Sequence, residues 1–165
     1  MTNFVLVNLP THGTLSGSGA NQTYTPTNNY FGPDSFTFTV NDGSLTSTVA
    51  TVSITVLSVN DVPVATNFSV TIPEDSSTNL VVRGSDVEST NLSYALLNSP
   101  THGTLGTLNT NTGAVTYSPS NNFNGADSFT FTVFDGALYA TGTVSITVSP
   151  VNDRSEERRV GKECA

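Results

Sequence analysis

Carboxylates are the side chains of this sequence that could carry chemistry. The 165 residues include 13 Asp and Glu against 5 Lys and Arg, which gives a formal net charge of −8. A catalytic nucleophile needs a neighbouring base, but the two histidines, His12 and His102, lie in identical Pro-Thr-His-Gly segments, and no lysine precedes residue 154. The sequence therefore predicts a protein that is not an enzyme. Grouped carboxylates have another use, because Ca²⁺ in proteins is bound by several oxygen ligands.

The charge balance and the hydropathy exclude two kinds of partner. Phosphate binding requires clustered Lys and Arg, so this acidic chain is not expected to bind nucleic acid. No apolar run is long enough to cross a bilayer, so no membrane insertion is expected. Charged residues make up only 11% of the sequence. Thr, Ser, Asn, Val and Gly take their place, and this composition favours strands over helices.

Residues 154–165 differ in composition from the rest of the chain. They contain four of the five bases and the single cysteine, Cys164. Residues 154–164 resemble, codon for codon, one reading frame of a sequencing adapter. We therefore expect 154–165 to be an artefactual or disordered tail and leave it out of the fold. A short basic linker is the alternative interpretation.

The chain repeats itself with a period of 90 to 93 residues. Residues 4–15 match 94–105, residues 23–43 match 116–136, and residues 51–61 match 143–153. A period of this length is a small domain rather than one turn of a solenoid. The sequence predicts a complete second copy over 62–153 and a truncated first copy over 1–61, which lacks any counterpart of 62–91.

Apolar residues alternate with polar ones in both copies, which is typical of half-buried strands. In the second copy the pattern predicts seven strands, at 65–72, 79–84, 92–98, 103–107, 114–118, 127–134 and 140–149. The first copy retains counterparts of the last five. Seven short strands in about 90 residues indicate an immunoglobulin-like sandwich. The predicted fold class is therefore all-β, with tandem Greek-key sandwiches.

Strand order predicts where the acidic residues lie. Loops alternate between the two ends of such a sandwich, and the ends are separated by one strand, about 26 Å. The ten acids before residue 154 are all expected at one end or the other. One end of the second copy holds Asp86, Glu88 and Asp135, and its other end holds Glu74, Asp75, Asp127 and Asp153. In the first copy, Asp42 lies at one end, and Asp34 and Asp61 lie at the other.

This alternation predicts a cation site where the two copies meet. The residues expected there are Asp34, Asn60, Asp61, Asp86, Glu88 and Asp135. Five carboxylates repel one another unless they are neutralised, and a bound Ca²⁺ would neutralise them and stiffen the junction. Two alternatives stay open. The acids could serve only ordinary turn chemistry, or Arg83 could form an ion pair with Asp86 or Glu88.

The same residues resemble cadherin-like or bacterial Ig-like tandem repeats of large bacterial surface and secreted proteins, including adhesins. The resemblance covers residues 1–153. It lies in Pro-Glu at 73–74, Asp-x-Glu at 86–88, an acid before the strand at 127–134, Asp-Gly after that strand, and Val-Asn-Asp-x-Pro at 59–63. It implies that the six junction residues bind Ca²⁺. It also implies that Glu74, Asp127, Asn152 and Asp153 form half of a further site, shared with a missing next repeat.

The sequence also departs from the cadherin pattern. The linker is one acid and one Asn short, and the acid before the strand at 127–134 is single. We therefore expect one or two Ca²⁺ ions rather than three.

The resemblance implies a non-enzymatic, extracellular spacer or adhesion module that Ca²⁺ makes rigid. Its expected partners are neighbouring repeats of the same chain and a cell-surface protein or glycan. One alternative is a carbohydrate- or ligand-binding accessory module of a secreted polysaccharide-degrading enzyme. The absence of Trp counts against it, and the aromatic residues Tyr30 and Phe123 are expected to cap the core rather than bind sugar. A sandwich that needs no metal is the other alternative.

Overall fold

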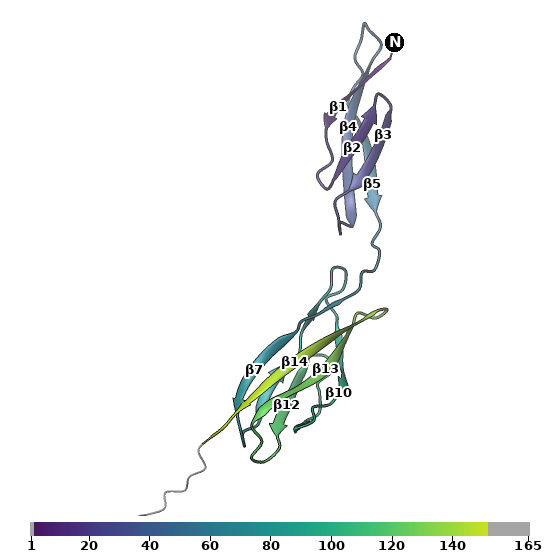
Figure 1. The fold of residues 1–165 in the computed structure, drawn as a ribbon. Coiled ribbons are helices and arrows are strands. Elements are labelled where there is room, and N and C mark those ends of the chain that lie inside the picture. Colours follow the sequence, from purple (N-terminus) through teal and green to yellow (C-terminus); the bar gives the residue numbers. More distant parts are fainter. Residues whose placement is uncertain (1, 152–165) are drawn as a thin grey trace, which may run out of the picture. The chain divides into compact units, whose positions relative to one another are not determined.

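The computed structural model describes residues 2–151 and divides the chain into two units, Met1–Asn60 (unit 1) and Asp61–Ala165 (unit 2). Both units consist of strands joined by turns (Figure 1). The predicted all-β fold class is confirmed. No helix occurs within residues 2–151, so none there could span a membrane.

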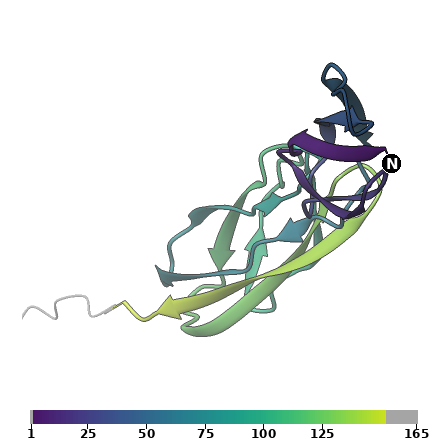
Figure 2. The same cartoon turned by 90° about the horizontal axis from the view of Figure 1, so that it is seen from above.

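Unit 2 is built from two main sheets and a short strand pair. The first sheet contains, in order, β10 (Ser93–Asn98), β13 (Gly125–Phe134), β14 (Tyr139–Ser149) and β7 (Phe68–Pro73). The second contains β11 (Gly103–Leu105), β12 (Ala114–Pro119) and β8 (Thr78–Val81). The short pair is β6 (Val64–Ala65) with β9 (Gly84–Ser85). In Figure 2 the long green strand β13 and the yellow-green strand β14 run side by side.

All seven strands predicted for unit 2 are present, but the first two are each broken in two. The strand expected at 65–72 forms β6 and then β7, and the strand expected at 79–84 forms β8 and then β9. The break lets the first segment change partner: β6 pairs with β9, whereas β7 runs parallel to β14 from Phe68 opposite Val144 to Pro73 opposite Ser149. The other pairs in both main sheets are antiparallel.

The core of unit 2 lies between its two sheets. One face of β13 contributes Phe129, Phe131 and Val133, which are at most 1% exposed. Tyr117 of β12 and Val144 of β14 are completely buried. The first strands close this core with Ile72, Leu80 and Val82. Burial of this kind is the main favourable contribution to folding.

Unit 1 contains counterparts of the last five strands of unit 2. One sheet holds β1 (Asn3–Asn8), β4 (Gly32–Asn41) and β5 (Ala50–Val56), and the other holds the hairpin of β2 (Gly13–Ser18) and β3 (Asn21–Pro26). Every fully buried apolar side chain within residues 2–151 belongs to unit 2. The apolar faces of unit 1 are therefore only partly covered by the residues described.

Candidate functional site

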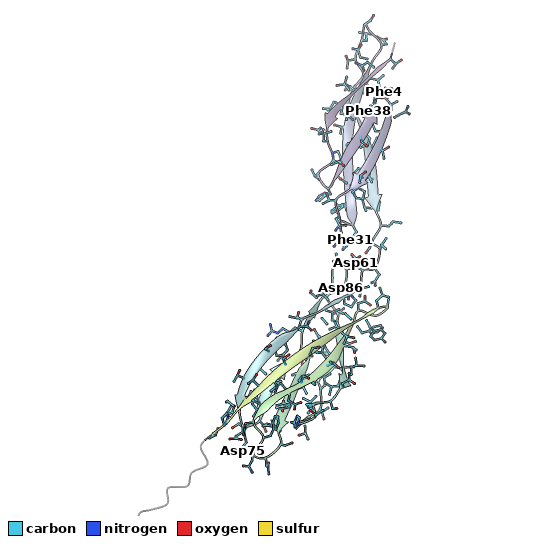
Figure 3. All side chains as sticks on the ribbon, in the orientation of Figure 1. Phe4, Phe31, Phe38, Asp61, Asp75 and Asp86 are labelled. Carbon is cyan, nitrogen blue, oxygen red and sulfur yellow. The ribbon has the colours of Figure 1, made fainter. Side chains whose placement is uncertain are left out.

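The acidic residues of unit 2 lie at both of its ends, as strand alternation predicts. Figure 3 shows Asp61 and Asp86 at one end and Asp75 at the opposite end. Asp86 and Glu88 follow β9, and Asp135 follows β13. The end that contains Asp61, Asp86, Glu88 and Asp135 is called the acidic end below.

Asp86 organises the loop that follows β9. Its Oδ1 accepts hydrogen bonds from the backbone N–H groups of Glu88, at 3.0 Å, and Ser89, at 2.7 Å. Its Oδ2 is buried and has no hydrogen-bond partner within residues 2–151. A buried carboxylate oxygen without a partner is costly, because its lost hydration is not replaced. This oxygen is therefore suited to a ligand that carries positive charge.

Two further acids of this end are held by backbone amides. Glu88 Oε2 accepts a hydrogen bond from Asp61 N–H at 3.0 Å, so the start of unit 2 is fastened to the loop after β9. Asp135 Oδ1 accepts from Ala137 N–H at 2.6 Å and Leu138 N–H at 2.7 Å, and so caps the turn between β13 and β14. These bonds fix the loops that carry the acids.

The acidic end fits a divalent cation only in part. The buried Oδ2 of Asp86 supports such a site, and carboxylates are the ligands that Ca²⁺ prefers. Against it, residues 2–151 contain no group of three or more His, Cys, Asp or Glu side chains arranged to hold a metal ion. Arg83, the possible ion-pair partner of Asp86 or Glu88, is exposed. That Asn60 and Asp34 of unit 1 join these acids stays a prediction.

Asp127 has a different role, because its side chain points into unit 2. It is 8% exposed. Its Oδ1 accepts from the N–H groups of Thr101, at 3.0 Å, and Ser128, at 2.9 Å. Its Oδ2 accepts from His102 N–H at 3.0 Å and from the Tyr117 hydroxyl at 2.8 Å. This arrangement, which we call the carboxylate clamp, ties the loop before β11 to β12 and β13.

The same clamp recurs in unit 1 around Asp34. Its Oδ1 accepts from Thr11 N–H at 3.0 Å and Ser35 N–H at 2.8 Å. Its Oδ2 accepts from His12 N–H at 3.0 Å and the Tyr24 hydroxyl at 2.8 Å. In both units the Pro-Thr-His-Gly segment therefore presents two backbone N–H groups to one carboxylate.

The carboxylate clamp changes the pKa of both its aspartate and its tyrosine. Burial alone would raise the pKa of Asp34, but the three backbone N–H donors and the phenol outweigh it and lower this pKa to about 2. Burial and the bond to Asp34 raise the pKa of Tyr24 to about 12. In unit 2, burial alone would raise the pKa of Asp127, but the hydrogen bonds from Tyr117 and the backbone outweigh burial and lower this pKa. Burial and the Asp127 carboxylate raise the pKa of Tyr117.

Sequence reasoning missed the clamp and counted Asp34 and Asp127 only as metal ligands. Both lie inside a strand, as the third residue of β4 and of β13, rather than before it. A signal was available: Asp127 shares its parity with Phe129 and Phe131, and so must share their inward face. Five hydrogen bonds, counting those of 3.4 Å from the Thr11 and Thr101 hydroxyls, give each aspartate a structural role. Metal binding by either one stays a prediction.

Glu74 closes the opposite end of unit 2. It is 5% exposed, and its Oε1 accepts from Val151 N–H at 2.7 Å. Its Oε2 accepts from the Asn124 side-chain amide at 3.4 Å. Asp75 Oδ1 accepts from Asn122 N–H at 3.0 Å. These bonds join the turn after β7 to the end of β14 and to the loop before β13. The other two residues predicted for a half site here, Asn152 and Asp153, lie outside the described residues.

The two histidines stack on the aromatic residue before the next long strand. The rings of His102 and Phe123 are 4.3 Å apart at an interplanar angle of 6°, and those of His12 and Tyr30 are 4.1 Å apart at 8°. Phe123 also packs against the core of unit 2. One flat face of Tyr30 and one of Phe123 are therefore covered by the histidine ring of the same unit.

Two solved protocadherin structures share this fold. Human mucin-like protocadherin EC1-2 is 19% identical, with 91% of this chain and 85% of that chain covered and a TM-score of 0.60. Human protocadherin-24 EC1-2 is 15% identical, with 89% and 81% covered and a TM-score of 0.52. An endo-fucoidan hydrolase of glycoside hydrolase family 107 is 23% identical over 91% of this chain, with a TM-score of 0.47, and this chain spans 24% of its length. No curated protein matches the sequence.

Family models match both units. Residues 1–55 match the model described as bacterial Ig domain. Residues 60–150, more than half of the chain, match the model described as bacterial cadherin-like domain. The resemblance inferred from the sequence is confirmed, and the chain belongs to the bacterial cadherin-like domain family.

Proposed function

We propose that this chain is a non-enzymatic, extracellular spacer or adhesion module of a longer tandem-repeat protein, and that Ca²⁺ binds at the acidic end of unit 2. The repeat in the sequence and the two family matches support the tandem arrangement. Bacterial cadherin-like and Ig domains are generally surface or extracellular modules, which supports the location. Its partners would be neighbouring repeats and a cell-surface protein or glycan.

The observation that carries the calcium proposal is the buried Oδ2 of Asp86. Its companion Oδ1 is fixed by two backbone N–H groups, so Oδ2 is held in one direction before any ion arrives. Such preorganisation lowers the entropic cost of binding. The carboxylates of Glu88, Asp61 and Asp135 would supply the remaining charge.

Bound Ca²⁺ would neutralise the acids of this end and join them through shared oxygen ligands. Two of these acids already hold the loops of the acidic end through hydrogen bonds to the backbone. Glu88 ties the residue that begins unit 2, and Asp135 caps the turn between β13 and β14. The expected result of binding is a stiffer start to unit 2, which suits a spacer that holds a distal domain in place.

Calorimetric titration of the full chain with Ca²⁺ tests the proposal. We expect a dissociation constant of about 10⁻⁴–10⁻³ M, as is typical of extracellular modules. Asp86→Ala should weaken binding about tenfold, which corresponds to about 1.4 kcal/mol. The matched control is Asp42→Ala, because Asp42 caps the turn of unit 1 that corresponds to the turn capped by Asp135. Absence of heat in the wild type, or equal effects of the two substitutions, would contradict the proposal.

A further inference from the structure

One strand has the same sequence in both units but different neighbours. The segment TVSITV occurs at 51–56, within β5, and at 143–148, within β14. In unit 2, β14 pairs with β13 on one side and, in parallel, with β7 on the other. In unit 1, β5 pairs with β4, and within residues 2–151 no strand pairs with its outer edge. An edge of this kind is a template for a further strand.

The second sheet of unit 1 is open at the corresponding edge. In unit 2, β12 lies between β11 and β8. Its counterpart β3 pairs with β2, and no strand of the described residues takes the place of β8. Unit 1 thus presents two open edges, one in each sheet, and in unit 2 both edges are filled by a single continuous segment, residues 64–85.

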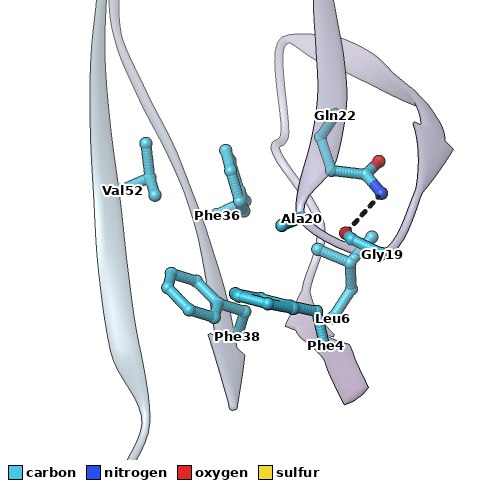
Figure 4. Close-up of a pocket in the computed structure, with 8 residues that line it drawn as sticks. All are labelled: Phe4, Leu6, Gly19, Ala20, Gln22, Phe36, Phe38 and Val52. Atoms are coloured by element: carbon cyan, nitrogen blue, oxygen red, sulfur yellow. Dashed lines mark hydrogen bonds between the residues drawn. The ribbon is translucent and has the colours of Figure 1, made fainter. Parts of the chain in front are cut away.

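An apolar groove of about 210 Å³ lies between the sheets of unit 1 (Figure 4). Its apolar lining includes Phe4, Leu6, Ala20, Phe36, Phe38 and Val52. The counterparts of Phe36 and Phe38 in unit 2 are Phe129 and Phe131, which are 1% and 0% exposed, whereas those of unit 1 are only half-buried. In unit 2 the counterpart of Val52 is Val144, which lies opposite Phe68 of the segment that unit 1 does not have among its described residues. Ile72, Leu80 and Val82 of the same segment are buried in the core of unit 2, and Phe68 packs against that core.

We infer that this groove and its two edges form an acceptor site for an extended segment of the same pattern as residues 64–85. The segment would pair in parallel with β5, pair in antiparallel with β3, and bury alternate apolar side chains in the groove. The identical acceptor strand sets the register: since Thr147 lies opposite Thr71 in unit 2, Thr55 of β5 lies opposite the residue that corresponds to Thr71. This inference requires no metal ion.

The occupant is an extended segment with the strand pattern of residues 64–85. It comes neither from unit 2 of the same molecule nor from unit 2 of a second copy of this chain. A donor copy would have to withdraw Ile72, Leu80 and Val82, which are at most 6% exposed, from the core of its own unit 2. It would also break the hydrogen bond between Glu74 N–H and the Ser149 carbonyl. That cost disfavours exchange between copies.

Register-specific cross-linking to a synthetic peptide tests the inference. The peptide spans residues 62–91 and carries Thr71→Cys, and the full chain carries Cys164→Ser and Thr55→Cys. Residues directly opposite in neighbouring strands are about 5 Å apart, within the range that a disulfide bridges. Thr55 and Thr71 are both exposed, so their substitution leaves the groove intact. The control is Thr51→Cys, about 13 Å out of register and also exposed.

In the presence of a calcium chelator we expect a disulfide at position 55 and little at position 51. Peptide binding should also slow hydrogen exchange of the amides of 51–56. A peptide with Ile72→Asp should bind at least about tenfold more weakly, since burying an Ile side chain contributes about 1.5–3 kcal/mol. Equal cross-linking at both positions would overturn the inference, as would no binding of the wild-type peptide. A stable dimer of the chain that the peptide does not dissociate would show that a second copy occupies the site, and would overturn it too.

Discussion

Two aspartates of unit 2 show that the direction of a side chain decides what a carboxylate does. Asp127 points inward, and both its oxygens accept hydrogen bonds from the protein itself. Asp86 fixes one oxygen through its own loop and leaves the other buried without a partner in the described chain. The first arrangement satisfies its charge internally and stabilises the fold. The second is suited to bind a cation.

Replacing Asp127 by Asn should destabilise unit 2 by about 2–4 kcal/mol, because an amide nitrogen would face backbone N–H donors. Tyr117→Phe removes a single donor and should cost about 1–2 kcal/mol. Urea denaturation in chelator and in Ca²⁺ measures both effects. The loss should be the same in the two conditions if the clamp is structural. A loss seen only with Ca²⁺ would instead identify Asp127 as a metal ligand.

The clamps also predict loss of stability in acid. The hydrogen bonds lower the pKa of Asp127 and bring that of Asp34 to about 2, whereas an unfolded Asp has a pKa of about 3.9. The unfolded chain therefore binds more protons over this interval, and stability falls as the pH drops from about 4 towards 2. The melting temperature measured against pH should show this fall. In the Asp127→Asn variant, the fall in the melting temperature of unit 2 with decreasing pH should be smaller than in the wild type. A profile identical to that of the wild type would contradict the role of the clamp.

The sequence predicts at which end of the sandwich the acids lie better than it predicts their roles. Strand alternation correctly places Asp86 and Asp75 at opposite ends of unit 2. Strand alternation could also have predicted that the Asp127 side chain points inward, because residues 127, 129, 131 and 133 share one face of the strand. The phenol of Tyr117 could not be assigned in this way. Its meeting with Asp127 depends on how two sheets pack, which no local pattern contains.

At the scale of elements, the broken first strand depends on a close approach at Gly84. A Cβ built at Gly84 would lie 2.7 Å from Val133 Cγ1 and 2.8 Å from the Val64 carbonyl oxygen. Only glycine lets β9 pair with β6 above the buried face of β13. The alternation of apolar residues predicts the strand but contains no sign of this crossing, so the sequence gives one continuous strand where the structure has two.

Gly84→Ala should therefore destabilise unit 2 by about 1–3 kcal/mol, the usual cost of overpacking a core. Gly106→Ala is the matched control, because its added Cβ would lie 3.6 Å from the nearest atom, an ordinary contact. That change should alter stability by no more than about 0.5 kcal/mol. Thermal denaturation of the two variants gives the comparison. Equal effects would show that the approach at Gly84 does not limit the fold.

At the scale of the whole molecule, the two units should differ in stability. All fully buried apolar side chains of residues 2–151 lie in unit 2, whereas Leu6 and Val7 of unit 1 are 37% and 48% exposed. Scanning calorimetry should show two transitions, with unit 1 unfolding at the lower temperature. Ca²⁺ should raise the upper transition and the peptide of residues 62–91 the lower one. A single transition that both ligands shift together would contradict this assignment.

The parallel pairing of β7 with β14 has a mechanical consequence. β7 lies near the start of unit 2 and β14 at the end of its described part, and six residue pairs join them. A pull on the two ends of this unit acts in opposite directions along neighbouring strands, so it loads their backbone hydrogen bonds in shear. These bonds must yield together rather than one by one. A domain with this topology resists stretching, as a tether under flow or traction requires.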